Sequence, residues 1–118
     1  MERLKEIQTP FCVADADFPD FKHEDGNLTL SFIDYQEKHI EVYFPDVLAF
    51  KWQMIEELRD DEYYDRSYEI ENSKWLKAHK DQRVIEEKEE YTHYKFNFNA
   101  CGCLEVLSME FRMVNKNE

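Results

Sequence analysis

The sequence predicts an α+β fold in two layers, with a mostly antiparallel sheet covered on one face by one or two short helices. Three observations lead to this prediction. Apolar and polar residues alternate in several short runs, which is the pattern of strands with one buried face. Short turn-like segments join most of these runs, and short connections favour antiparallel neighbours. No strand–helix–strand unit repeats along the chain, so a doubly wound parallel sheet is not expected.

The length and composition predict a single domain over residues 1–118. The chain has 118 residues, of which 42% are hydrophobic and 15% are aromatic. Chains of this length usually form one domain. The mean hydropathy is -0.79, but disordered chains are poor in aromatic residues. We therefore expect a folded protein with one core.

The N-terminal residues predict a helical turn, a short edge strand and a loop. Residues 2–7 predict one short helical turn ahead of Pro10. Residues 11–14 predict a short edge strand. Residues 15–27 are mostly polar and carry Pro19 and a final Asp-Gly-Asn turn signal, so a loop is expected there.

The clearest alternation lies between residues 28 and 52. Residues 28–32 place three apolar side chains on one face of a strand, and residues 40–44 do the same for the next strand. The polar segment 35–38 between them predicts a turn, so the two strands should form an antiparallel hairpin. Residues 47–52 either resume as a bent strand or begin a helix, and their aromatic and branched side chains favour the strand.

Two helices are expected in the middle of the chain. Residues 53–64 have apolar side chains spaced among charges, as in a short amphipathic helix. The acidic C-terminal half of this segment opposes the helix dipole, so that end should fray. After a short strand over 67–71, Asn72 or Ser73 is a good N-cap for a helix that runs through His79.

The last third of the chain predicts a hairpin of two strands. Thr92, Tyr94, Phe96 and Phe98 share one face of the first strand. Residues 99–102 form a tight connection whose final glycine suits a left-handed backbone. The final strand is expected to bear Leu107, Met109, Phe111 and Met113 on one face. Residues 83–90 are charged and fit either a helix or a loop, and the tail from residue 115 is expected to fray.

The large aromatic residues are interpreted as core rather than as a ligand pocket. Trp52, Trp75, Tyr94 and Phe96 belong to this set. Aromatic side chains at strand spacing usually build a core. His93, next to Tyr94, should then lie on the opposite and more polar face of its strand.

The cysteine count and the N-terminus predict a cytoplasmic protein with reduced thiols. Cys12, Cys101 and Cys103 make an odd number, and the first residues contain no apolar run of signal-peptide length. No stretch approaches the length of an apolar membrane span. The pair Cys101 and Cys103 is separated by one residue, which is too close for the usual zinc-ligand spacing.

No catalytic, cofactor or metal residues are predicted, and the chain is expected not to be an enzyme. Ser67, Ser73 and Ser108 lack the sequence context of a nucleophile elbow. Only two glycines are present, so a phosphate-cradling loop is excluded. The acidic residues between 15 and 25 do not match the ligand spacing of a helix–loop–helix calcium site. We interpret them as a solvated loop.

The net charge indicates which class of partner the protein would bind. The chain has 27 acidic and 15 basic side chains, for a formal charge of -12. Such a field repels nucleic acid and anionic membranes, and it raises the association rate with a basic protein. The alternative interpretation is that the acidity only keeps the protein soluble.

A strip of mixed carboxylates and tyrosines is the candidate partner-binding surface. Residues 56–71 hold eight acidic side chains but only two arginines. Tyrosines supply contact area and carboxylates supply steering. The alternative is a helix end with exposed acids and tyrosines packed inward. The residues assigned to this acidic strip are Asp60, Asp61, Glu62, Tyr63, Tyr64, Asp65 and Tyr68.

Four segments carry a resemblance to a class of small bacterial proteins. They are Ile40-Glu-Val-Tyr-Phe-Pro-Asp-Val-Leu-Ala-Phe-Lys-Trp52, Glu71-Asn-Ser-Lys-Trp-Leu76, His93-Tyr94 and Leu104-Glu-Val-Leu-Ser108. Over about residues 28 to 113 the chain resembles immunity-type proteins, some of which are encoded beside secreted polymorphic toxins. The resemblance implies a cytoplasmic protein that binds one toxin domain tightly and blocks its active site. It carries no catalytic residues over to this chain.

The charge and the resemblance lead to the same expectation. We expect a non-enzymatic acidic protein, monomeric or weakly dimeric, that neutralises a basic and nuclease-like toxin domain. Toxin domains that bind phosphate backbones tend to be basic. Three alternatives stay open: an inhibitor of a host enzyme that mimics nucleic acid, a small enzyme or ligand-binding domain, and a subunit of a larger assembly.

Overall fold

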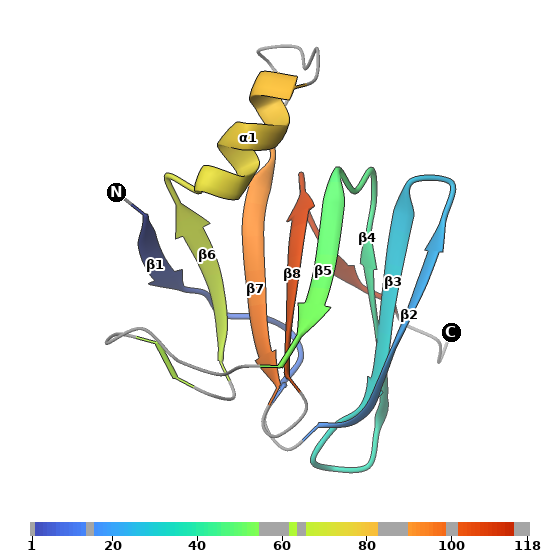
Figure 1. The fold of residues 1–118 in the computed structure, drawn as a ribbon. Coiled ribbons are helices and arrows are strands. Elements are labelled where there is room, and N and C mark those ends of the chain that lie inside the picture. Colours follow the sequence, from blue (N-terminus) through green and yellow to red (C-terminus); the bar gives the residue numbers. More distant parts are fainter. Residues whose placement is uncertain are drawn as a thin grey trace.

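The computed structural model shows two antiparallel sheets and one helix within the residues that it describes (Figure 1). It describes residues 2–13, 16–54, 62–63, 66–82, 90–98 and 102–114. The five-stranded sheet has the order β1 (Arg3–Glu6), β6 (Ser67–Glu71), β7 (Thr92–Phe98), β8 (Gly102–Ser108) and β5 (Ala49–Gln53). The four-stranded sheet has the order β2 (Asp17–Glu24), β3 (Asn27–Ile33), β4 (His39–Phe44) and β9 (Arg112–Met113). The helix α1 spans Lys74–Gln82.

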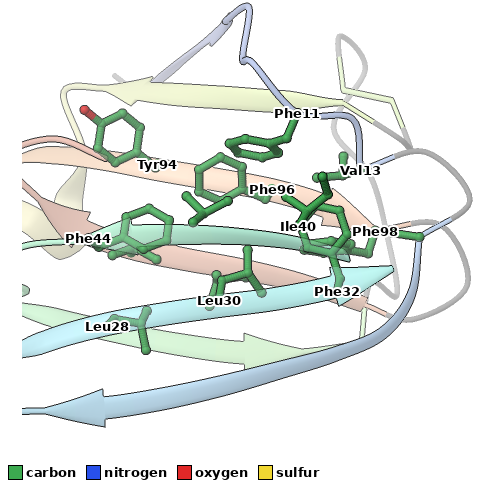
Figure 2. Close-up of a cluster of buried hydrophobic side chains, with 14 residues drawn as sticks. Phe11, Val13, Leu28, Leu30, Phe32, Ile40, Phe44, Tyr94, Phe96 and Phe98 are labelled. Atoms are coloured by element: carbon green, nitrogen blue, oxygen red, sulfur yellow. The ribbon is translucent and has the colours of Figure 1, made fainter. Parts of the chain in front are cut away.

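The core lies between the two sheets (Figure 2). Rings from the two sheets meet edge to face: the centroids of Phe44 and Phe96 are 5.7 Å apart, and those of Phe32 and Phe98 are 5.4 Å apart. Burial of such rings is the main favourable term in a fold of this size. The buried cluster comprises Phe11, Val13, Ala16, Leu28, Leu30, Phe32, Ile40, Val42, Phe44, Tyr94, Phe96, Phe98, Leu104 and Val106.

The α+β class and the antiparallel pairing are confirmed. The predicted hairpin is β3–β4, in which Leu30 faces Val42 and Phe32 faces Ile40. Residues 47–52 do contribute a strand, β5, which pairs with β8. The four-stranded sheet closes the core on one side of the five-stranded sheet, and the first turn of α1 meets the opposite, outer face, where the Trp75 ring contacts His93.

The N-terminal predictions are wrong, because long-range pairing decides this region. Residues 3–6 form an edge strand beside β6 rather than a helical turn, with Leu4 opposite Ile70. Residues 11–13 are not a strand, yet Phe11 and Val13 fill the core. The predicted loop over 15–27 is largely β2, whose pairing with β3 contains a register shift that interrupts the alternation.

The C-terminal hairpin is confirmed, but the final strand is not the one predicted. Strands β7 and β8 pair along their whole length, and Gly102 has a φ of 122°. Strand β8 ends at Ser108, whose hydroxyl donates to the carbonyls of Pro45 and Glu110. The chain then leaves the five-stranded sheet, so Met109 is exposed and β9 pairs with β4 instead.

The two uncertain helical segments fall mainly outside the described residues. Gln53 ends β5, and residues 62–63 are not helical. Residues 55–61, 64–65 and 83–89 lie outside the description. The helix predicted to follow Asn72 or Ser73 is confirmed as α1, and Ser73 is its N-cap.

Candidate functional site

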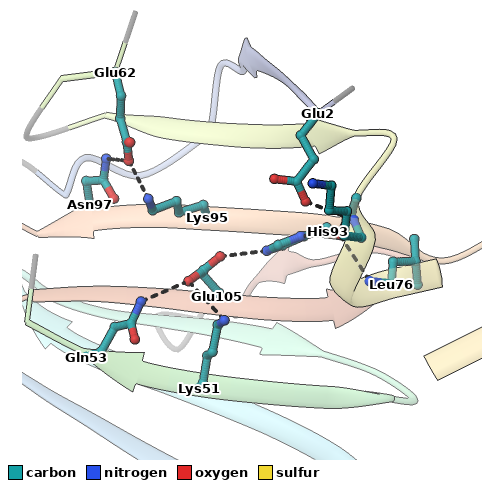
Figure 3. A network of polar contacts seen from close by, with 11 residues as sticks. Glu2, Lys51, Gln53, Glu62, Leu76, His93, Lys95, Asn97 and Glu105 are labelled. Atoms are coloured by element: carbon teal, nitrogen blue, oxygen red, sulfur yellow. Dashed lines mark hydrogen bonds and ion pairs between the residues drawn. The ribbon is translucent and has the colours of Figure 1, made fainter. Parts of the chain in front are cut away.

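A row of buried polar side chains lies on the outer face of the five-stranded sheet (Figure 3). Along β7, His93, Lys95 and Asn97 alternate with the core residues and therefore point away from the second sheet. Glu105 on β8 belongs to the same face, because it lies directly opposite Lys95. His93 is 3% exposed and Glu105 is 6% exposed. Buried polar groups of this kind need partners.

Ser73, His93 and Glu105 form a continuous chain of hydrogen bonds. The Ser73 Oγ is 2.6 Å from His93 Nδ1, and His93 Nε2 is 2.8 Å from Glu105 Oε1. Ser73 is also the N-cap of α1, since its Oγ accepts the Leu76 amide proton at 3.1 Å. One hydroxyl therefore joins the start of the helix to the two central strands.

Glu105 is held as a carboxylate by its surroundings. Burial by itself would raise its pKa, but the hydrogen bond from His93 and the positive charges of Lys51 and Lys95 outweigh burial, and the pKa is lowered. Its second oxygen lies 3.7 Å from Lys51 Nζ and 3.4 Å from Gln53 Nε2. The Lys51 ammonium also sits 4.5 Å from the centre of the Trp75 ring.

A cavity opens beside this chain of hydrogen bonds, between β6, α1 and the start of β7. Its volume is about 840 Å³, and Ser73 and His93 both contribute to its lining. Glu69 and Glu71 line it from β6, and the helix contributes lysines, including Lys77. A concave site with converging polar groups is the usual form of a small-molecule site.

The structure places the described residues of the predicted acidic strip in two different environments. Glu62 is buried and bonded to Asn97 Nδ2 at 2.9 Å, and it forms an ion pair with Lys95. Tyr68 is also buried, and burial raises its pKa. Tyr68 therefore matches the alternative in which tyrosines pack inward, whereas Glu62 is a buried acid that neither interpretation expected. Tyr63, in contrast, is 57% exposed.

The main chain of Tyr63 is held on both sides by buried groups. Its amide donates to the Tyr68 hydroxyl oxygen at 2.8 Å, and its carbonyl accepts from Asn97 Nδ2 at 3.0 Å. The Arg66 guanidinium lies 5.2 Å from the centre of the Tyr63 ring. The remaining predicted strip residues, Asp60, Asp61, Tyr64 and Asp65, lie outside the described part of the chain.

A second acidic region gathers at the other end of the two sheets, where several connections are tied together. The Asp46 amide donates to Asn27 Oδ1 at 2.9 Å, and the Tyr91 hydroxyl donates to Asp46 Oδ2 at 3.0 Å. Glu90 and Glu110 are exposed in the neighbouring connections. We call this region the loop end, consisting of Asp25, Asp46, Glu90, Tyr91 and Glu110.

No pattern in the sequence connects Ser73, His93 and Glu105. The sequence predicts only that Ser73 is a possible N-cap and that His93 lies on the polar face of its strand. His93 and Glu105 come together only because the β7–β8 register sets Lys95 opposite Glu105 and His93 opposite Leu107. No short sequence motif predicts that register.

The two described cysteines differ in burial. Cys103 is buried, and burial raises the pKa of its thiol, whereas Cys12 is exposed. Cys101 lies outside the described residues. Across the described ranges, no group of three or more His, Cys, Asp or Glu side chains is arranged to hold a metal ion. In these same ranges no helix is long and apolar enough to span a membrane.

Comparison with known proteins adds no assignment to this geometry. No protein-family model, no curated protein and no solved structure matches the chain. Its function must therefore be inferred from its own residues and contacts.

Proposed function

We propose that this protein is an acidic binding protein of the immunity type, acting in the cytoplasm on one basic partner. The partner class is a toxin domain that handles nucleic acid, and binding neutralises it by covering its substrate groove. The observation that carries the proposal is that the Tyr63 side chain is exposed while its main chain is held by two hydrogen bonds, within an acidic segment. Tyrosines presented in this way are common anchors of protein interfaces.

The charge balance supports a basic partner. The pairs Arg66–Glu6, Lys95–Glu62 and Lys51–Glu105 each join one positive and one negative side chain. Because these pairs are neutral, they leave the excess of 12 negative charges unchanged. The net negative charge therefore remains, and its electrostatic field attracts a positively charged surface.

The buried members of the acidic strip have a structural part in the proposal. Tyr68 and Glu62 do not contact the partner. Tyr68 and Asn97 hold the Tyr63 main chain, and Glu62 fixes the Asn97 amide. The proposed contact residues are therefore Tyr63 together with Asp60, Asp61, Tyr64 and Asp65.

The first experiment identifies the partner. The tagged protein is used to capture proteins from native lysate of its source at low salt and again at high salt. The retained protein is then produced separately, and the complex is reassembled from the two purified chains. The proposal predicts a stoichiometric complex with one basic protein, whose toxicity is suppressed by co-expression. A neutral or acidic partner, or a partner whose activity is unaffected, contradicts it.

A matched pair of variants then locates the surface. Asp60→Lys with Asp61→Lys changes the charge of the acidic strip by four units, and Glu90→Lys with Glu110→Lys makes the same change at the loop end. If contact is at the strip, the first variant should raise Kd much more than the second. Equal effects of both variants would show attraction by overall charge alone and would remove the strip from the proposal.

A further inference from the structure

The chain of hydrogen bonds from Ser73 to Glu105 has the parts of an activated hydroxyl. Ser73 supplies a nucleophilic hydroxyl, His93 a base 2.6 Å from it, and Glu105 a carboxylate 2.8 Å from the other ring nitrogen that orients the base. All three side chains are more than nine-tenths buried. Ser73 and His93 are nevertheless both among the residues that line the cavity of about 840 Å³.

The hydrogen-bond partners determine which nitrogen of His93 carries the proton. The Glu105 carboxylate only accepts, so the neutral imidazole presents Nε2–H to it. Nδ1 is then left as an acceptor, and the Ser73 hydroxyl donates to it. The Ser73 oxygen also accepts the Leu76 amide proton, which fixes its orientation. This is the protonation state that a general base requires before it removes a proton from serine.

We propose that Ser73 is a nucleophile toward small carboxylic esters that enter the cavity between β6 and α1. The proposal concerns a different site from the acidic strip and stands independently of the binding function proposed above. It departs from the expectation, drawn from the sequence, that the chain has no catalytic residues. That expectation depended on the absence of a known sequence motif, whereas Ser73, His93 and Glu105 come together only in the folded chain.

The reaction balances with water as the only co-reactant. Ser73 Oγ adds to the ester carbonyl carbon while its proton moves to His93 Nδ1. The bond to the leaving alcohol oxygen then breaks, and that oxygen takes the proton from Nδ1. A water molecule adds to the acyl-serine and gives a proton to Nδ1, the bond to Oγ breaks, and Oγ recovers that proton. The products are a carboxylic acid and an alcohol.

The surroundings support each group in its role. The Trp75 ring packs edge-on against the His93 ring, with centroids 5.1 Å apart, and holds the imidazole in place. Ser73 lies at the positive end of α1, where negative charge on an attacked carbonyl oxygen is stabilised. Glu2 already accepts the Lys74 amide proton at 2.8 Å. The Trp75 amide is in the same first turn and has no acceptor within the helix. Glu105 acts through His93 and is a positioning residue.

The test uses covalent labelling, because labelling identifies the reacting atom. The full chain is incubated with a fluorophosphonate probe and, separately, with p-nitrophenyl acetate, followed by intact-mass measurement and peptide mapping. The proposal predicts one adduct, on the peptide that contains Ser73, and release of nitrophenol. Absence of an adduct, or an adduct elsewhere on the chain, overturns it.

The variants separate chemistry from folding. Ser73→Asn keeps a side chain that caps the helix but has no nucleophilic hydroxyl, so it should melt near the wild-type temperature and form no adduct. His93→Gln should slow labelling by about a hundredfold or more, because the base is lost. Ser31→Ala removes a hydroxyl on the other sheet and should label at the wild-type rate. Equal labelling of Ser73→Asn and wild type also overturns the proposal.

Discussion

His93 Nε2 on β7 lies 2.8 Å from Glu105 Oε1 on β8, and both side chains are buried. The two residues are 12 positions apart and belong to neighbouring strands, so the contact depends on the hairpin register. It links the polar face of the central strands to Ser73 at the start of the helix. Stability and the proposed chemistry therefore depend on the same carboxylate.

We predict that Glu105→Gln makes stability less dependent on acid pH. The pKa of Glu105 is lower in the folded protein than in the unfolded chain, so the folded state binds fewer protons between the two values. This contribution is present above the ordinary pKa of a glutamate and is lost as pH falls through the lower folded value. Urea unfolding from pH 7 downward should show the variant less stable near neutrality, with the difference shrinking on acidification.

The control for this prediction is Glu110→Gln, which removes an exposed carboxylate. It should leave the pH profile close to that of the wild type. A constant stability difference between Glu105→Gln and wild type across the whole acid range would show that the Glu105 charge is not stabilised by folding.

Gly102 is predicted to be intolerant of any side chain. Its φ is 122°, and an added Cβ would lie 2.6 Å from the Gln53 carbonyl oxygen and 3.2 Å from a Trp52 ring carbon. Backbone strain and overlap together should cost about 2–4 kcal/mol for Gly102→Ala. Gly26→Ala is the matched control, because Gly26 has a φ of 80° but no neighbour within 4 Å of the added atom. It should cost only about 1 kcal/mol, and equal losses in thermal unfolding would contradict this account of the hairpin.

Tyr68→Phe is predicted to lower stability through the Tyr63 main chain. The substitution removes the hydroxyl oxygen that accepts the Tyr63 amide proton at 2.8 Å. The expected loss is about 1 kcal/mol in the free energy of unfolding, and hydrogen exchange at the Tyr63 amide should become faster. Tyr35→Phe alters an exposed ring and should change nothing. Unaltered exchange at Tyr63 would mean that this hydrogen bond does not hold the segment.

The cysteines are predicted to differ in reactivity toward a thiol reagent. The pKa of Cys103 is raised by burial, which leaves its thiol protonated at neutral pH. Cys12 is exposed. In a Cys101→Ser background, native protein should release one equivalent of chromophore from Ellman's reagent, and denatured protein should release two. Rapid reaction of two thiols in the native state would show that the outer face of β8 opens readily.

The alternation of apolar and polar residues predicted those strands in which one face is buried and the other is more accessible to solvent. The hairpin β3–β4 is one such case, since Leu28, Leu30 and Phe32 alternate with half-buried residues. The helix α1 was predictable from its cap and from its exposed lysines. Strand β2 was missed because a register shift breaks its alternation, and β1 was missed because a four-residue edge strand carries almost no local signal.

The candidate sites were harder to predict, because they depend on contacts between distant residues. Glu62 and Tyr68 resemble the other members of the acidic strip in the sequence, yet pairing with Lys95 and with the Tyr63 amide draws both inward. Ser73 and His93 are separated by 20 positions and meet only because the fold brings the start of α1 beside β7. Composition predicts a basic partner, and burial shows that Glu62 and Tyr68 are enclosed whereas Tyr63 is exposed.

The most direct test of the central proposal is the salt dependence of association between this protein and its captured partner. Stopped-flow association is measured at about 50 and about 500 mM salt, where screening of exposed charges differs strongly. The proposal predicts a rate that falls by about tenfold or more at high salt. The Asp60→Lys, Asp61→Lys variant should associate more slowly at low salt, and its association rate should fall less at high salt. An association rate that is the same at both salt concentrations, and the same in the variant, would contradict an acidic protein that recognises its partner by charge.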